Sequence, residues 1–348
     1  GKPVPCQYEI SEGGEALTLA WIVENLGRGE AKKYRVRFEE ALGGQPPEPG
    51  VSLHESFRGQ IDIVVKGQLF TSCHFGEGVI RPYLHPVVGP YSKLVTRGFP
   101  MIPDAPGEVK DHPHHRSIWV AHGDVNKVDN WSEMSGHGRI VHRGFEKRVE
   151  GPIYAELISR NDWVAHSGEK VLEEERRILV YNTPPYARMM DVEATFHATE
   201  GDVTFGDTKE GGIVSVRVAS SMDVVRGGRI ENSYGGINEA ETWGKRAQWC
   251  DYSGPVEGQW VGISVFDHPE NLRHPTYWHV RNYGLMTANC FGISYFTQNP
   301  KNRGDYTLKG GEKLRFRYRL LIHQGDANQG KVKERYHDYI NPPTITVT

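Results

Sequence analysis

The sequence has little of several features that mark common protein classes. It contains four cysteines in 348 residues and no Cys-x-x-Cys pair, which excludes a disulfide scaffold, a zinc ribbon and a thioredoxin-type motif. It has no uninterrupted apolar run of about 18 residues, the length that a membrane helix needs. The formal charge is only −3, from 41 basic and 44 acidic residues. Neither nucleic acid nor a membrane is therefore an expected partner.

Several motifs of cofactor-binding and hydrolytic enzymes are also missing. The chain has no Gly-x-Ser-x-Gly elbow, no P-loop and no His-Glu-x-x-His pattern. The segment 136–138 reads Gly-His-Gly but lacks the third glycine and the βαβ context of a dinucleotide fingerprint. A dinucleotide-binding enzyme, a P-loop enzyme and a zincin are therefore not expected.

The composition instead favours strands joined by turns. Forty Gly, 21 Pro and 16 Tyr stand beside only 6 Met, a balance that suits many short strands better than a helical bundle. Residues 314–319 alternate between apolar side chains and arginines, as a half-buried antiparallel strand requires. The segment that reads as helical is 326–340, with Asp326 as its expected N-cap. We therefore predict an all-β fold, a large antiparallel double sheet with a short C-terminal helix.

A break in composition divides the chain. Three of the eight residues in 43–50 are prolines, which cannot donate to a strand ladder. We expect a small N-terminal β-module over residues 1–45 and the main domain over 55–348. The chain starts with Gly-Lys-Pro rather than Met, which is compatible with a removed leader peptide, and the localisation we favour is periplasmic or secreted.

Histidine is the residue that stands out. There are 16, and six fall within 31 residues: His112, His114, His115, His122, His137 and His142. If 114–122 is one strand rising ~3.3 Å per residue, His114 and His122 share a face but lie roughly 26 Å apart, so they cannot bind one ion. The segment then predicts two sub-sites: His112, His114 and Arg116 at its start, and His122, Asp124 and Asn126 at its end. Several of these residues could equally be hydrogen-bonded structural groups.

Two further segments carry candidate chemistry. Lys209 and Glu210 stand at a strand end before Gly-Gly and can form an acid/base pair; a charged hairpin turn explains them equally well. Aromatic residues beside polar groups offer flat faces for a sugar ring, although aromatic side chains in strands are more often core. These candidates are Trp131, Trp243, Tyr277 and Trp278.

Several motifs together resemble one bacterial family. They are His112 to Ser117, Ala121 to Asn126, Gly138 to His142, Glu200 to Gly212, Phe266 to Pro269 and His274 to His279. The resemblance covers roughly residues 60–325 and is to proteins labelled "methane oxygenase PmoA" or a domain of unknown function. The oxygenase label fits badly, because a true particulate methane monooxygenase subunit spans the membrane. The resemblance implies a galactose-mutarotase-like supersandwich, a genetic neighbourhood of sugar metabolism and a carbohydrate substrate.

Three functional hypotheses follow. The first is a carbohydrate-active enzyme that cleaves or isomerises a glycoside or modified sugar by acid–base chemistry. Its catalytic candidates are His114, His115, His122, Asp124, Lys209 and Glu210, and its substrate-binding candidates are Arg116, Asn126, Trp131, Trp243, Tyr277 and Trp278. The second is a metal-dependent lyase or hydrolase that holds Zn²⁺, Mn²⁺ or Ca²⁺ with His112, His274 and His279, joined by His114 or His122. The third is a non-catalytic sugar-binding module. A homo-oligomer remains open under all three.

Overall fold

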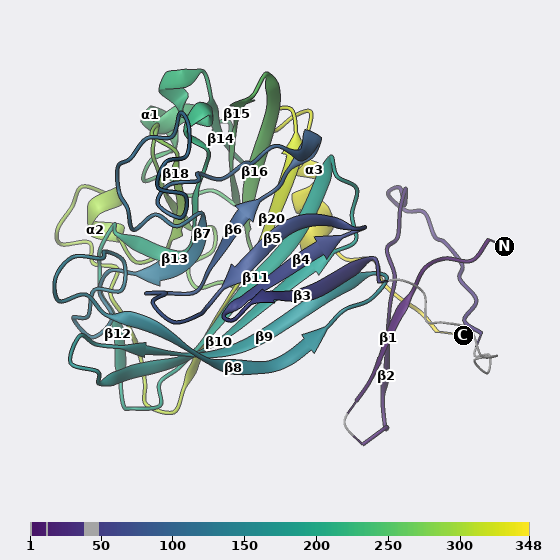
Figure 1. The fold of residues 1–348 in the computed structure, drawn as a ribbon, viewed down its shortest axis with the longest axis horizontal. Coiled ribbons are helices and arrows are strands. Elements are labelled where there is room, and N and C mark those ends of the chain that lie inside the picture. The colour runs from purple at the N-terminus through teal and green to yellow at the C-terminus, as the bar shows by residue number, and fades with distance from the viewer. Residues whose placement is uncertain (1, 12, 38–48, 348) are drawn as a thin grey trace.

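Two large antiparallel sheets build most of the molecule. The structure, a computed structural model, describes residues 2–11, 13–37 and 49–347. Sheet I contains, in spatial order, β17 (Tyr277–Val280), β18 (Leu285–Asn289), β13 (Gly211–Arg217), β7 (Ile118–His122), β6 (Tyr83–Val87), β5 (Gln68–His74), β4 (Gln60–Val65) and β3 (Val51–Phe57). Sheet II contains β14 (Arg229–Asn232), β15 (Trp249–Val256), β16 (Gln259–Asp267), β20 (Lys313–Gln324), β11 (Ala187–His197), β10 (Lys170–Tyr181), β9 (Tyr154–Val164) and β8 (Arg139–Val149). The predicted all-β fold with a large antiparallel double sheet is confirmed (Figure 1).

The remaining elements are small. Two strand pairs lie outside the large sheets: β1 (Gln7–Ile10) with β2 (Leu17–Ala20), and β12 (Val203–Phe205) with β19 (Tyr306–Leu308). The helices are α1 (Asn238–Thr242), α2 (Ile293–Phe296) and α3 (Val332–Ile340), and the 3₁₀ turns are η1 (Pro90–Ser92), η2 (Ser220–Met222) and η3 (Val224–Arg226). None of the helices in the described ranges is long and apolar enough to cross a membrane.

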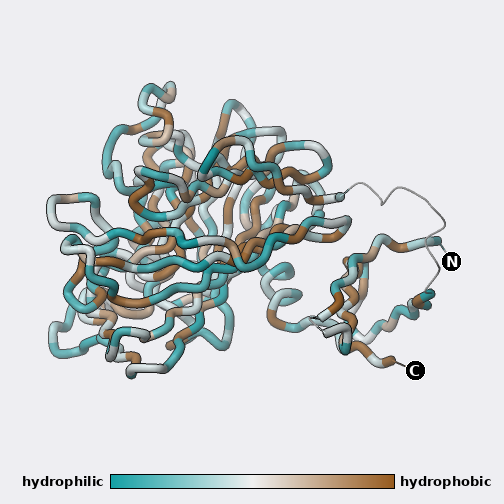
Figure 2. Tube along the Cα trace, turned by 60° about the horizontal axis from the view of Figure 1, so that its bottom comes forward, coloured by the Kyte–Doolittle hydropathy of each residue, from teal (hydrophilic) through white to brown (hydrophobic). Residues whose placement is uncertain are grey.

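The core lies between the two sheets, because alternate side chains of each strand face inward. On β20 the residues Leu314, Phe316 and Tyr318 are buried, while Arg315 is exposed, as the alternating pattern predicts. Sheet I contributes Ile118 and Val120 from β7 to the same core. In Figure 2 the hydrophobic stretches run mainly along the strands of this main body.

The C-terminal helix is shorter than the sequence predicts. Helix α3 begins at Val332 rather than near Asp326, because Lys331 has a left-handed backbone with φ 53°. Asp326 instead accepts hydrogen bonds from the backbone N–H groups of Asn328 and Gln329 in the preceding turn. The short helices α1 and α2 were not predicted.

The N-terminal hairpin projects from the main body beside both chain ends (Figure 1). Gln7 connects it to the body: its Oε1 accepts hydrogen bonds from the backbone N–H groups of Ile153 and Tyr154, at 3.1 and 3.0 Å. Most of the predicted boundary at 43–50 lies outside the described residues. The division into a 1–45 module and a 55–348 domain stays a prediction.

Candidate functional site

The histidine-rich segment reaches the outer face of sheet I, the face turned away from the core. The prediction that 114–122 is one strand is wrong for its first half, since β7 begins at Ile118. His112 and Ser117 have left-handed backbones, with φ 41° and 59°, so the chain turns before it enters the strand. The side chains of His112, His114 and His115 therefore gather instead of alternating along a strand.

These histidines are part of a stack of aromatic rings. The rings of Tyr283, His112, His115 and Trp119 lie nearly parallel in that order, with centroid separations of 5.0, 4.8 and 5.4 Å. Trp131 packs against the edge of the stack, 5.4 Å from His115 and 5.3 Å from Trp119. His115, Trp119 and Trp131 are almost fully buried, while His112 and His114 are partly exposed.

A charged cluster beneath the stack fixes the protonation of His115. Asp111 Oδ1 accepts hydrogen bonds from Arg97 Nη1 at 2.5 Å and Arg217 Nη2 at 2.8 Å. Arg217 Nη1 lies 3.1 Å from His115 Nδ1. Because a guanidinium can only donate, His115 Nδ1 must be the acceptor, and the ring's proton sits on Nε2. Burial, reinforced by His114, Arg217 and His112, lowers the pKa of His115 well below its usual value, so the ring is neutral at pH 7.

His114 is a partly exposed imidazole beside this cluster. Its pKa is lowered to about 4, first by burial and then by Arg81 and His112, against the opposing carboxylates of Glu133 and Glu210. Its side chain makes no hydrogen bond to any residue in the described part of the chain. His114 therefore carries a free lone pair at neutral pH and can accept a proton.

Two buried arginines hold the loops that carry these rings. Arg97 donates to the backbone carbonyls of Phe99, Val109 and His112, at 2.9, 3.2 and 2.9 Å. Arg81 donates to the carbonyls of His114, Trp131 and Ser132, at 3.1, 2.8 and 3.1 Å. Both side chains are 0% exposed. Arg97 thus holds the segment between Phe99 and His112, and Arg81 connects the segment before β7 to the segment after it.

Arg116, predicted to bind substrate, is engaged within the protein. Its guanidinium makes two hydrogen bonds of 2.7 Å to the carboxylate of Glu133. The same carboxylate accepts from Arg81 Nη1 at 3.2 Å. Arg116 therefore stabilises the loop around Glu133, and a ligand would have to compete with a two-point ion pair.

The second predicted pair, Lys209 and Glu210, lies on a loop at the same face. The two side chains are hydrogen-bonded to each other. The Glu210 carboxylate acts to raise the pKa of His114 and of Tyr283, although burial has the largest effect on each. Burial is also the main cause of the lowered pKa of His279, and the Lys209 ammonium lowers it further. The loop thus lies between the histidine-rich segment and β17.

One buried side chain, Asn289 on β18, holds this loop. Its Nδ2 donates to the backbone carbonyls of Thr208, Lys209 and Gly211, at 3.0, 3.2 and 2.7 Å. Its Oδ1 accepts from the next turn of the chain, at 2.8 and 2.9 Å. Asn289 therefore fixes the backbone of the loop that carries Lys209 and Glu210.

His279 and Trp243 lie at the far side of the same face. The indole Nε1 of Trp243 donates to His279 Nδ1 at 2.9 Å, so the proton of His279 is also on Nε2. Burial, followed by Lys209 and Arg281, lowers the pKa of His279 to about 3. This histidine is a neutral hydrogen-bond donor at pH 7.

The predicted sub-site at the end of β7 lies elsewhere. His122 points into the core, where its ring Nε2 lies 2.9 Å from the carbonyl of Gly206 and burial lowers its pKa to about 4. Asp124 accepts from the backbone N–H of Lys127 at 2.9 Å, and Asn126 accepts from the backbone N–H of Thr204 at 2.7 Å. The structure does not bring these three residues to the face that carries His114.

The predicted aromatic platforms are largely covered. Trp278 is fully buried in the core and donates to the carbonyl of Ala247. Tyr277 packs between Phe296 and the guanidinium of Arg246. Trp131 is 2% exposed, so among the four candidates only Trp243 and Tyr277 keep part of their surface open.

The residues proposed as metal ligands do not form one donor set. His274 Nδ1 contacts Asp267 Oδ2 at 2.7 Å, and His279 Nδ1 is engaged by Trp243. His112 Nδ1 lies 3.1 Å from Asp111 Oδ2, in the ring stack. Across 2–11, 13–37 and 49–347, no three His, Cys, Asp or Glu residues are placed to hold an ion. The predicted Zn²⁺, Mn²⁺ or Ca²⁺ site with His112, His274 and His279 does not fit this arrangement.

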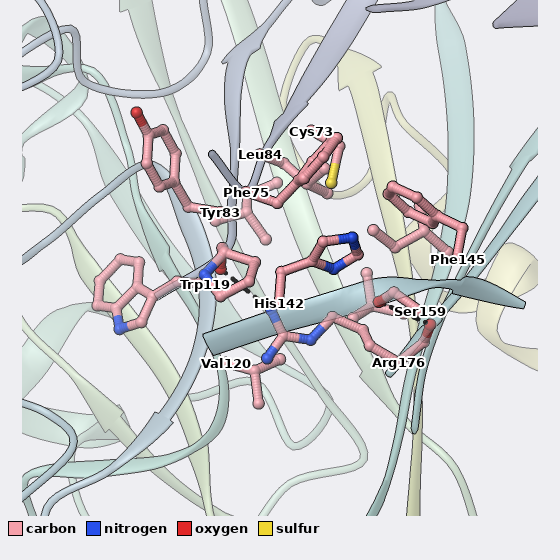
Figure 3. Close-up of a pocket in the computed structure, with 14 residues that line it drawn as sticks. Cys73, Phe75, Tyr83, Leu84, Trp119, Val120, His142, Phe145, Ser159 and Arg176 are labelled. Atoms are coloured by element: carbon pink, nitrogen blue, oxygen red, sulfur yellow. Dashed lines mark hydrogen bonds between the residues drawn. The ribbon is translucent and has the colours of Figure 1, made fainter. Parts of the chain in front are cut away.

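A separate cavity lies inside the sandwich, between β5–β7 and β8–β10. Figure 3 shows His142, Phe145 and Arg176 around it, while the indole of Trp119 extends away from it. Its free volume is about 20 Å³, room for roughly one water molecule. A sugar ring could not enter this cavity.

Sequence reasoning missed the residues that support the site. They are Arg81, Arg97, Glu133, Arg217, Tyr283 and Asn289. Most of their contacts are to segments far away in the sequence, and none stands in a local motif. The tertiary fold brings them together.

Comparison with known proteins places the chain in a family. A search of curated proteins finds no match. Among solved structures, a heparan sulfate lyase HepC from Pedobacter heparinus has a TM-score of 0.31 at 10% sequence identity. The match covers 77% of this chain and 30% of the lyase. A mutant of the same lyase has a TM-score of 0.31 at 11% identity. This chain therefore spans less than a third of the lyase. A GalM/aldose epimerase homologue from C. elegans has a TM-score of 0.33 at 10% identity, over 80% of this chain and 99% of that one. A family profile matches residues 60–337, and the chain belongs to the family described as "Family of unknown function (DUF6807)".

Proposed function

We propose that the protein is a carbohydrate-active enzyme that cleaves or isomerises a glycoside or modified sugar by acid–base chemistry at the outer face of sheet I. The observation that carries the proposal is that buried Arg81 and Asn289 hold two loops, almost a hundred residues apart, whose side chains His114 and Glu210 interact electrostatically. Rigidly held loops are where catalytic groups are usually placed.

The proposed roles follow from the protonation of each group. His114, neutral with a free lone pair, accepts a proton from a sugar hydroxyl or ring carbon. Glu210 is its partner acid–base group, and Lys209 pairs with it. His115, whose Nε2–H is fixed by Arg217, donates a hydrogen bond to the oxygen on which negative charge develops. His115 is thus a donor in this proposal and not the proton carrier.

The test is turnover on a panel of glycosides and free sugars, with products followed by NMR. A positioned acid or base contributes about 10²–10⁴-fold, so His114→Ala and Glu210→Gln should each lower turnover at least about tenfold while the protein stays folded. His166→Ala, which alters an exposed histidine on a turn, is the matched control and should be unaffected.

The outcomes separate the alternatives. Full turnover in both variants would show that the reacting groups lie elsewhere. Binding of sugars by the wild-type protein without any product would instead support the non-catalytic sugar-binding module.

A further inference from the structure

Two buried indoles in the candidate site have no hydrogen-bond acceptor. The Nε1–H groups of Trp119 and Trp131 are unpaired within the described residues, although the two side chains are only 1% and 2% exposed. Their rings are neighbours, with centroids 5.3 Å apart. Buried donors in folded proteins are nearly always paired, so two adjacent exceptions indicate a missing acceptor.

His115 adds a third donor to the same cluster. Its ring lies 5.4 Å from Trp119 and 5.4 Å from Trp131. Because its Nδ1 accepts from Arg217, its Nε2 carries the proton and has no partner in the ranges that the structure describes. The cluster therefore presents three N–H groups, and each of them can only donate.

The charges around the cluster favour an anion. Asp111 is shared by two guanidiniums, Arg97 and Arg217, and Glu133 is shared by Arg81 and Arg116. The additional carboxyl near Arg217, that of Asp223, has its pKa raised to about 6 by burial. Of the side chains that act most on His115, Arg217 and Arg97 are permanent cations, and both act to lower its pKa in addition to burial.

His114 packs beside two of these donor rings. Its ring packs edge-on against His115 and Trp131, with centroids 4.5 and 6.0 Å away. It is partly exposed, and its side chain makes no hydrogen bond to other described residues. A rotation about its side-chain bonds would break no hydrogen bond to a described residue and would change only its ring packing on His115 and Trp131.

We infer that this donor cluster binds the carboxylate of an acidic sugar, a uronic acid, and that the proposed acid–base enzyme acts on uronic-acid-containing glycans. A hydroxyl group would bring a proton that needs an acceptor, whereas a carboxylate has only acceptor oxygens and matches a donor-only cluster. The part of this inference that concerns turnover rests on the proposed function, whereas the binding of a uronate does not depend on it.

The experiment measures binding by calorimetry with glucuronate, galacturonate and di- to tetra-galacturonate as probes. Glucose, galactose and the methyl esters of the two uronates are the uncharged counterparts, and gluconolactone tests a neutral carbonyl. We expect uronates to bind at least about tenfold more tightly than their uncharged counterparts, because charge-assisted hydrogen bonds are the stronger ones. Tighter binding of gluconolactone than of every uronate would overturn the assignment of a carboxylate.

Variants then test the indoles directly. Trp119→Phe and Trp131→Phe keep a ring but remove the N–H. Replacement of either tryptophan by β-(3-benzothienyl)alanine, in which sulfur takes the place of N–H, preserves the shape if phenylalanine perturbs folding. Each change should weaken uronate binding several-fold and leave the binding of neutral sugars unchanged. The same replacement of Trp260, a partly exposed residue on sheet II, is the control.

The results distinguish the two proposals. Uronate binding without turnover would retain this inference and contradict the proposed enzyme. The proposed enzyme would be supported and the inference overturned if neutral sugars were turned over, uronates bound no more tightly than neutral sugars, and the tryptophan replacements left binding unchanged. Failure of all probes to bind would contradict both.

Discussion

Gly212 shows at the scale of one residue how closely the chain packs beneath the Lys209–Glu210 loop. Its φ is +142°, and a Cβ there would lie 2.0 Å from the carbonyl oxygen of Ala288. Gly201, with φ +120°, has no atom within 4 Å of the same position. We expect Gly201→Ala to cost about 1 kcal/mol of unfolding free energy from backbone strain, and Gly212→Ala more than about 3 kcal/mol because the clash is added.

Urea denaturation of the two variants measures this difference. Since both positions require a left-handed backbone, the comparison isolates the close approach of β13 to β18. If Gly201→Ala and Gly212→Ala lost the same unfolding free energy, strands β13 and β18 would be able to move apart without an energetic cost.

At this scale the sequence allows only part of the site to be predicted. The density of polar residues in 111–131 pointed to His114 and His115, and the Lys209–Glu210 pair was visible from its place before Gly-Gly. The two residues that fix these loops, Arg81 and Asn289, could not be found, because each acts through backbone carbonyls far away in the sequence. A residue that binds the main chain leaves no pattern of side-chain types.

Individual elements were predictable where side chains alternate and unpredictable where the backbone turns. Strand β20 shows its alternation directly in residues 314–319. The segment before β7 contains Pro113 and no aliphatic residue, and the left-handed conformations of His112 and Ser117 keep it out of the strand. Such conformations in residues other than glycine follow from tertiary contacts, here the carbonyl of His112 bound by Arg97.

Asn289 tests how strand β18 holds the loop that precedes β13. Asn289→Ala would leave three carbonyls and two N–H groups without their partners in a fully buried place. We expect a loss of at least about 3 kcal/mol of unfolding free energy, because each buried unpaired group is costly. Hydrogen exchange at residues 206–211 should also become faster.

Asn302→Ala is the matched control, since Asn302 lies on an exposed turn and its side chain makes one long hydrogen bond of 3.4 Å. This variant should change neither the unfolding free energy nor the rate of hydrogen exchange at residues 206–211. If exchange at 206–211 stayed slow in Asn289→Ala, the loop would be held by contacts other than this amide.

The whole molecule should lose stability in mild acid because of its buried histidines. Burial lowers the pKa of His85, His114 and His122 to about 4 and that of His279 to about 3, while their unfolded pKa is near 6.5. The unfolded chain therefore binds more protons than the folded one below about pH 6.5, and stability falls as the pH drops toward 4. Each such group contributes a slope of up to about 1.4 kcal/mol per pH unit.

His323 should act in the opposite direction. Burial alone would lower its pKa, but the carboxylate of Asp251, 2.8 Å from Nε2, raises it above the usual value. Its contribution to the unfolding free energy is therefore fully present below the pKa of the unfolded state, and it is lost as the pH rises through the pKa of the folded state. The raised pKa values of His323 and Asp223 cannot balance the larger number of lowered histidines, so the net effect between pH 6.5 and 5 is destabilisation by acid.

Urea denaturation at pH 7, 6 and 5 measures the slope, and His122 tests its origin. Its ring lies in the core near Phe205 and Phe291, and its Nδ1 has no partner among the described residues. His122→Gln keeps a donor for the carbonyl of Gly206 but cannot take up a proton, so the pH slope should fall by up to about 1.4 kcal/mol per unit. His166→Gln on the exposed turn should leave the slope unchanged, and a wild-type protein equally stable at pH 7 and pH 5 would contradict the assignment of neutral buried histidines.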